Sequence, residues 1–260
     1  MAFRKTYCIK RELIYKLLRY YYLAYRVIFE DKGLRDYKEM WDYQATLFSR
    51  LTEEKRNIRL QGKPSTTASP GVLIFVEHPH VYTLGRHGSE NNLLVSHIQL
   101  QAKNASFYRI DRGGDITYHG PGQIVGYPVF DLEAVGVSLK GYIHGLEEAV
   151  IRTLSIYGLK GERMDGATGV WLDSRSPGKA RKICAIGVKA SRYITMHGFA
   201  FNVNTALEYF GYINPCGFTD RGVTSLQKEL GEHQDIEKVK GYLKDKLREV
   251  FDLEYINQGG

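Results

Sequence analysis

Residues 71–76 read Gly-Val-Leu-Ile-Phe-Val, an almost uninterrupted apolar run. A short run of this kind, bounded by polar and turn-forming residues, is typical of a buried strand. Pro79 follows closely, and proline cannot donate a hydrogen bond within a sheet. The run therefore predicts a strand that lies inside a sheet and ends near His78.

Other segments show the same strand pattern or the three-and-four spacing of a helix that packs on a sheet. The further predicted strands are residues 27–29, 107–110, 124–130, 170–172, 183–188 and 199–203, the first closed by polar residues 30–33. One predicted helix begins at Asp36, which is a suitable N-cap. Two further helices are predicted over residues 138–157 and 236–250. Because strands and helices do not alternate strictly, the sequence predicts an α/β (α+β) fold: one domain with a mixed, largely antiparallel sheet flanked by helices.

The positive charge is concentrated at the N-terminus. Of the formal +7, residues 1–25 carry +5, because they hold six Lys and Arg but a single Glu. A nucleic-acid-binding domain spreads its basic residues along a folded face, so the sequence predicts no nucleic-acid partner. Residues 1–25 are interpreted either as a dispensable extension or as an amphipathic helix for an anionic surface.

Composition limits the setting of the protein. No apolar run approaches the length of about 20 residues that a membrane span needs, so no integral membrane segment is expected. The three cysteines are too few and odd in number for a disulfide framework. These features predict a cytoplasmic protein.

Residues 111–123, Asp-Arg-Gly-Gly-Asp-Ile-Thr-Tyr-His-Gly-Pro-Gly-Gln, form the richest candidate for a site. Four glycines let the backbone approach a ligand closely, and the segment also supplies Arg, Thr, Tyr and His side chains. We interpret it as a ligand-binding loop, with a plain connection between strands as the alternative. It lacks the Gly-Lys-Ser/Thr ending of a phosphate-binding loop.

Cys216 lies between Pro215 and Gly217, a context that favours a tight turn with an outward thiol, although a small buried residue is the commoner fate of a free cysteine. Cys184 lies within an apolar strand and is interpreted as buried. A nucleophilic thiol needs help to ionise. Lys182, held at the edge of the sheet, is one candidate partner, and His119 or His197 in a papain-like pair is another. No metal-ligand spacing is present, so no metal and no cofactor are expected.

Four segments together resemble the lipoyl(octanoyl) transferase family. They are Arg112–Gln123, the run Arg-Lys-Ile-Cys-Ala-Ile-Gly at 181–187, the run His-Gly-Phe-Ala-Phe-Asn-Val-Asn at 197–204, and Asn-Pro-Cys-Gly at 214–217. The resemblance covers residues 26–260, which are therefore expected to be the catalytic domain, with residues 1–25 as an extension. It implies the fold of lipoate and biotin protein ligases.

The resemblance also implies roles for individual residues. Cys216 matches the acyl-thioester nucleophile, and Lys182 matches the partner that lowers the thiol pKa and shuttles the proton. The residues that match the lining of the acyl pocket are Arg112, Gly113, Gly114, Asp115, Ile116, Thr117, Tyr118, His119, Ala185, Ile186, Gly187, Gly198, Phe199 and Ala200. His119 and His197 then become pocket or structural residues.

The implied activity is transfer of an octanoyl group from octanoyl-acyl carrier protein to a lysine of a lipoyl domain, the first step of protein lipoylation. The implied acceptors are the lipoyl domains of 2-oxoacid dehydrogenases and the glycine cleavage H protein. Two alternatives remain: an ATP-dependent lipoate-protein ligase, which would need no cysteine, and a non-catalytic relative that only binds lipoyl domains.

Overall fold

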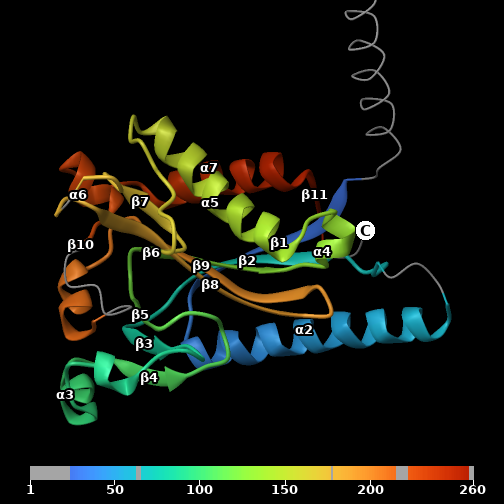
Figure 1. Ribbon diagram of the computed structural model, residues 1–260, viewed down its shortest axis with the longest axis horizontal. Helices are drawn as coiled ribbons and strands as arrows, with labels where there is room; N and C mark the ends of the chain where they lie inside the picture. The colour runs from blue at the N-terminus through green and yellow to red at the C-terminus, as the bar shows by residue number, and fades with distance from the viewer. Residues whose placement is uncertain (1–23, 63–65, 177, 215–221, 258–260) are drawn as a thin grey trace, which may run out of the picture.

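The computed structural model describes residues 24–62, 66–176, 178–214 and 222–257 (Figure 1). Most strands belong to one mixed sheet in the order β10-β8-β9-β6-β2-β1-β11, with β7 paired to β8. The bounds are β1 Tyr25–Leu34, β2 Gly71–Glu77, β6 Gln123–Val129, β7 Val170–Leu172, β8 Arg181–Ser191, β9 Ile194–Asn202, β10 Gly222–Val223 and β11 Leu253–Ile256. The central pairs β2–β6, β6–β9 and β8–β9 are antiparallel, whereas β1 pairs in parallel with β2 and β11. The predicted fold class is confirmed.

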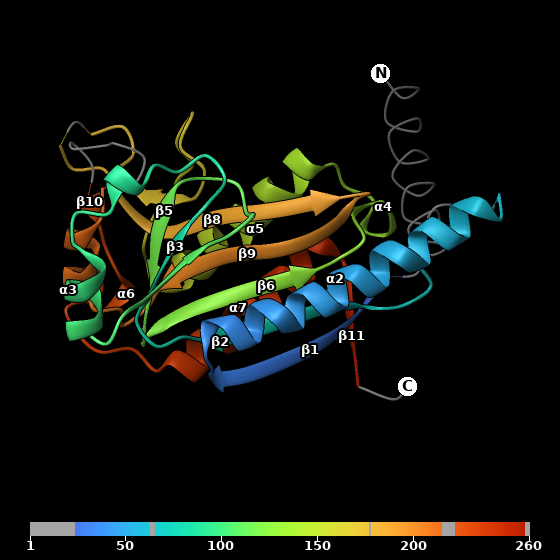
Figure 2. The same cartoon turned by 90° about the horizontal axis from the view of Figure 1, so that it is seen from below.

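Helices cover both faces of this sheet. The long α2 (Tyr37–Leu60) lies across one face, and α5 (Leu139–Ile156) and α7 (Ile236–Phe251) lie together on the other (Figures 1 and 2). The side chain of Asp36 accepts hydrogen bonds from the first backbone N–H groups of α2, as its position predicted. The shorter helices are α3 His97–Ala102, α4 Leu132–Val135, α6 Leu226–Leu230 and the 3₁₀ turns η1 Glu90–Asn92 and η2 Leu207–Tyr212.

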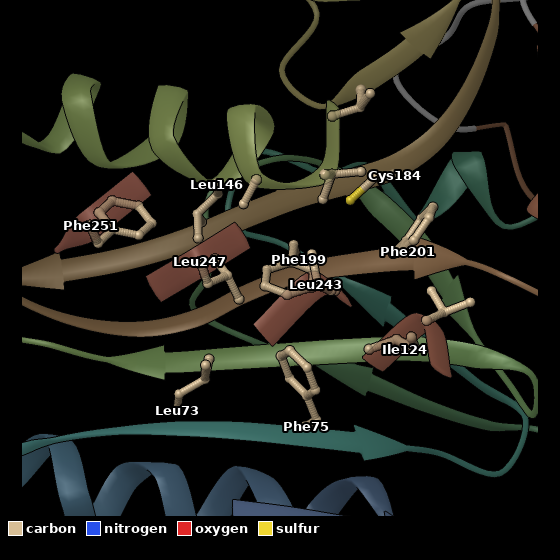
Figure 3. Packing of buried hydrophobic residues seen from close by; sticks show 14 of the residues in the cluster. Leu73, Phe75, Ile124, Leu146, Cys184, Phe199, Phe201, Leu243, Leu247 and Phe251 are labelled. Carbon is tan, nitrogen blue, oxygen red and sulfur yellow. The ribbon is translucent and has the colours of Figure 1, made fainter. Parts of the chain in front are cut away.

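The apolar run of β2 is continuous because both faces of the strand are buried. Leu73 and Phe75 pack into the larger core beneath α5 and α7 (Figure 3), while Ile74 and Val76 pack against Leu51 and its neighbours on α2. Side chains alternate between the two faces of a strand, so one run serves both cores. None of the helices in the described part of the chain is long and apolar enough to cross a membrane.

A second, three-stranded sheet has the order β4-β3-β5, formed by Ser106–Arg109, Val81–Leu84 and Ile116–His119. Strand β3 was not predicted from the sequence, and residues 111–123 were interpreted as a loop throughout. That interpretation is wrong for 116–119, because these residues form an antiparallel ladder with β3. Their partner, β3, lies more than thirty residues earlier in the chain, so no local sequence pattern predicts the pairing.

Two further boundaries differ from the prediction. Strand β1 continues through the polar residues 30–33, because parallel pairing with β2 holds the backbone and Glu30 accepts a hydrogen bond from the Tyr43 hydroxyl. Tyr25, assigned to the extension, is instead the first residue of β1 and pairs with Leu253. Residues 1–23 of the extension lie outside the described residues.

Candidate active site

A cavity of about 760 Å³ opens over the middle of β8 and β9. It is lined by twelve of the fourteen residues that the sequence analysis assigned to a pocket. These are Arg112, Gly114, Asp115, Ile116, Thr117, His119, Ala185, Ile186, Gly187, Gly198, Phe199 and Ala200. Three segments that are distant in sequence therefore meet at one cavity.

The other two predicted residues, Gly113 and Tyr118, are not among the described lining residues. The backbone N–H of Gly113 donates to the carbonyl of Val188 at 2.9 Å, which ties the 112–114 segment to β8. Tyr118 is fully buried in the core of the second sheet, beside the rings of Tyr82 and Tyr209. The ring of Tyr118 therefore belongs to that core, and a role for this residue in the acyl pocket stays a prediction.

The floor of the cavity depends on close backbone approach at a pair of glycines. Gly187 and Gly198 are directly opposite each other in the β8–β9 ladder. A Cβ on Gly198 would lie 2.1 Å from the carbonyl oxygen of Gly126, and a Cβ on Gly187 would lie 2.8 Å from that of Gly113. Any larger residue would push neighbouring strands or the 112–114 segment apart, so the narrow floor requires glycine at both positions.

Lys182 lines the cavity and is half-buried. Its Nζ donates to the carbonyl of Thr168 at 3.2 Å and lies 4.7 Å from the centre of the Trp171 ring. Lys182 was expected at the edge of the sheet, but β8 is not an edge strand at this point. Lys182 is paired with Trp171 of β7 and also with Val223 of β10. Flanking strands and an aromatic ring restrict the lysine, and the two residues that its amine contacts, Thr168 and Trp171, also line the cavity.

Cys216 lies outside the described residues, and so does Cys8. The residues that bound the 215–221 segment, Asn214 and Gly222, both line the cavity that Lys182 lines. Cys184, by contrast, is fully buried in the larger core (Figure 3), as predicted, and burial raises the pKa of its thiol. Cys184 is therefore protonated and inaccessible.

The two histidines of the cavity have fixed partners. Nδ1 of His119 donates to Oε1 of Gln123 at 2.8 Å, and burial lowers the pKa of His119 to about 3. Nε2 of His197 donates to Oδ1 of Asp111 at 3.1 Å, and burial also lowers the pKa of His197. Such weakly basic side chains are poor general bases near neutral pH, which counts against a papain-like pair.

Arg112 braces the cavity wall. Its guanidinium donates to the carbonyl and hydroxyl of Thr83 at 2.8 and 3.0 Å and to the carbonyl of Gly113 at 3.0 Å. These contacts join the 112–114 segment to β3.

In the described part of the chain, no group of three or more His, Cys, Asp and Glu side chains could hold a metal ion.

The 166–171 segment, which contributes Thr168 and Trp171 to the cavity, was not among the predicted site residues. Its signal was a pair of closely spaced glycines, Gly166 and Gly169, which both have positive φ, at 72° and 122°. Such a pair marks a turn in which glycine is favoured. The strand prediction at 170–172 concealed the turn before it.

The sequence matches a known family over most of its length. The model of the lipoyl protein ligase A/B catalytic domain matches residues 36–248. The chain is 54% identical over 223 residues to an octanoyltransferase of Parabacteroides distasonis, with 86% of this chain and 97% of that protein covered. It is 50% identical over 231 residues to an octanoyltransferase of Cytophaga hutchinsonii, with coverage of 89% and 95%.

Solved structures share the fold at much lower identity. A lipoate-protein ligase A bound with ATP has a TM-score of 0.63 at 14% identity, covering 91% of this chain and 89% of its own. A bipartite lipoate protein ligase of Thermoplasma acidophilum, solved in a study of that enzyme and its E2 lipoyl domain, has a TM-score of 0.61 at 16% identity, with coverage of 90% and 86%. These similarities establish the lipoate-ligase fold of the chain.

Proposed function

Because the chain belongs to the octanoyltransferase family, we propose that it transfers an octanoyl group from acyl carrier protein to a lysine of a lipoyl domain through a thioester on Cys216. The observation that carries this proposal is the convergence on one cavity. Lys182 and both residues that bound the 215–221 segment line it, together with the apolar residues Ile186 and Phe199. An amine, a cysteine-bearing segment and an apolar floor are what acyl transfer to a thiol requires.

In the first half-reaction, the Cys216 thiol gives its proton to the Lys182 amine, and the thiolate attacks the thioester carbonyl of the octanoyl group. The tetrahedral intermediate collapses as the bond from carbon to the carrier sulfur breaks. The Lys182 ammonium then gives the proton to the departing thiolate. The products are octanoyl-Cys216 and the free thiol of the carrier.

In the second half-reaction, the amine of the acceptor lysine attacks the carbonyl of octanoyl-Cys216. Lys182 takes a proton from the attacking nitrogen, and the bond from carbon to the Cys216 sulfur breaks. Proton return from Lys182 restores the thiol. Thioester-to-amide transfer is downhill in free energy, so the two half-reactions need no ATP. Two successive acyl transfers predict ping-pong kinetics.

Strand geometry supports an oxyanion donor at Ile186. The carbonyl of Val188 accepts from Gly113, so at Val188 the backbone polar groups of β8 point away from β9. Residues two apart in a strand direct their N–H and C=O groups to the same side. The N–H of Ile186 therefore faces the side of the 112–114 segment, where Arg112 and Gly114 line the cavity. A backbone donor there would stabilise the tetrahedral oxyanion.

The two partners follow from the reaction. Octanoyl-acyl carrier protein is the donor, and lipoyl domains, including those of 2-oxoacid dehydrogenases and the glycine cleavage H protein, are the acceptors. Both must meet the chain in one compartment, which we propose is the cytoplasm.

The test is a transfer assay with purified octanoyl-acyl carrier protein and an unmodified lipoyl domain, followed by mass spectrometry. We expect octanoylation of the lipoyl domain without ATP, and none of a lipoyl domain whose acceptor lysine is replaced by arginine. Transfer from free octanoate that depends on ATP would instead identify a ligase. Binding of the lipoyl domain without transfer under either condition would identify a non-catalytic relative.

A further inference from the structure

Glu147 is a buried carboxylate that lies on α5, outside the cavity. Its residue surface is only 5% exposed. Oε2 accepts a hydrogen bond from Nε of Arg163 at 3.0 Å, and Oε1 accepts one from the backbone N–H of Gly169 at 3.1 Å. Burial of a carboxylate is unfavourable unless it is paired and hydrogen-bonded. The hydrogen bond from Gly169 involves the peptide group that also contacts Lys182.

The Gly169 N–H and the Thr168 carbonyl belong to one peptide group. The Glu147 carboxylate binds the N–H of that group, and the Lys182 ammonium binds its carbonyl at 3.2 Å. In a trans peptide these two bonds point in opposite directions across one plane. A carboxylate, a peptide group and an ammonium are thus connected in series, an arrangement in which each hydrogen bond strengthens the next.

The segment that carries this peptide is fixed on its other sides as well. The indole N–H of Trp171 donates to the carbonyl of Ala167 at 2.8 Å. A Cβ on Gly169 would lie 2.4 Å from the carbonyl oxygen of Cys184, so the segment presses directly on β8. A shift of the Thr168 carbonyl would therefore move the seat of Lys182 relative to the cavity.

We propose that Glu147 is a positioning residue for Lys182: its carboxylate holds and polarises the peptide group between Thr168 and Gly169, whose carbonyl holds the lysine ammonium at the cavity. This inference rests on the proposed function of Lys182. It assigns to α5 an indirect part in the acid–base step, through the Thr168–Gly169 peptide group, although Glu147 is not among the described residues that line the cavity.

The surrounding charges are consistent with this role. Burial has the largest effect on the pKa of the Cys184 thiol and raises it; Lys182 lowers this pKa, and the Glu147 carboxylate raises it further. Arg163 is held by Glu147 and Glu148, and Arg181 is held by Asp173 and Glu229. Both arginines thus have their own carboxylate partners.

The neighbouring Glu148 supplies a matched control. It binds the same Arg163, at 2.7 Å, as well as Arg152, at 2.9 Å, and it is more exposed than Glu147. Glu148→Gln removes the same charge beside the same arginine without touching the Gly169 amide. Glu147→Ala removes both acceptors and the charge, whereas Glu147→Gln keeps one oxygen for the Gly169 N–H, removes the charge and replaces the acceptor for Arg163 with an N–H donor.

The experiment measures single-turnover acylation of Cys216 and transfer to the lipoyl domain as functions of pH. We expect Glu147→Ala to slow both steps by about 10- to 100-fold, the range expected when a catalytic group is misplaced by about 1 Å. Glu147→Gln should lose less, and Glu148→Gln should stay within about twofold of wild type because exposed ion pairs contribute little.

The pH profile separates positioning from simple stability. Loss of the Glu147 charge disfavours the Lys182 ammonium, so the alkaline fall in the acylation rate should move to lower pH in Glu147→Gln. A structural role would lower the melting temperature and leave this limb in place. Folded Glu147→Gln enzyme with the wild-type rate and profile would overturn the proposal, even if Glu147→Ala failed to fold.

Lys182→Met distinguishes failure of this inference from failure of the proposed function. If Lys182→Met is impaired and the Glu147 variants match wild type, only the inference about Glu147 is wrong. If Lys182→Met is itself fully active, the assignment of Lys182 is wrong, and with it the premise of the inference.

Discussion

Replacing Lys182 with Met removes the amine and keeps most of the side-chain volume. In the folded protein the amine donates a hydrogen bond to the Thr168 carbonyl and contacts the Trp171 ring. At a half-buried site these contribute about 1–2 kcal/mol together. Loss of a general acid–base group lowers a rate by about 10²–10⁴-fold, equivalent to about 3–5 kcal/mol. The effect on catalysis should therefore exceed the effect on folding.

The assay is single-turnover formation and decay of octanoyl-Cys216 at a temperature where circular dichroism shows the variant to be folded. Lys179→Met is the control, because it removes the same charge only three residues before Lys182. The Lys179 side chain is exposed and is not among the described residues that line the cavity. We expect wild-type rates for this control and losses in both half-reactions for Lys182→Met. A folded Lys182→Met enzyme with more than about a third of the wild-type rate would refute the acid–base role.

Two further predictions concern stability. Asp131 is fully buried with Lys55, and its carboxylate also accepts from the Thr67 N–H at 2.9 Å, so Asp131→Asn should lower the free energy of unfolding by about 3 kcal/mol in urea titrations. A loss no larger than that from Asp42→Asn at an exposed ion pair would contradict this. Burial lowers the pKa of His78 from 6.5 to about 4, so the unfolded chain binds more protons than the folded chain between these pH values. The free energy of unfolding should therefore decrease by up to about 1.4 kcal/mol per pH unit as the pH falls through that window. His78→Asn should flatten this dependence, and an unchanged slope would argue against a buried neutral histidine.

Local chemistry explains which parts of the fold were predictable. Asp36 and Ser138 cap helices with their own side chains, and the 71–76 run shows burial directly. Strands β3 and β5 were missed because each is short and is stabilised by pairing with a distant segment. A four-residue strand among polar residues and glycines carries no periodic signal of its own.

The site divides in the same way. The glycine-rich segment, Lys182 and the residues of β8 and β9 were identified from their motifs, and the structure brings them to one cavity. Thr168 and Glu147 were not identified, because the contribution of each is a contact across the fold rather than a property of its sequence neighbourhood. The Glu147–Gly169 contact joins residues 22 positions apart, through a backbone amide that no motif marks.

The proposed mechanism depends on a cysteine thioester that carries the acyl group. The most direct test is intact-protein mass spectrometry after the chain is mixed with octanoyl-acyl carrier protein in the absence of ATP. We expect one octanoyl adduct that hydroxylamine removes and that peptide mapping places on Cys216. The Cys216→Ala variant should lack both this adduct and all transfer activity. An unmodified wild-type enzyme that still transfers octanoyl, or normal turnover by Cys216→Ala, would contradict it.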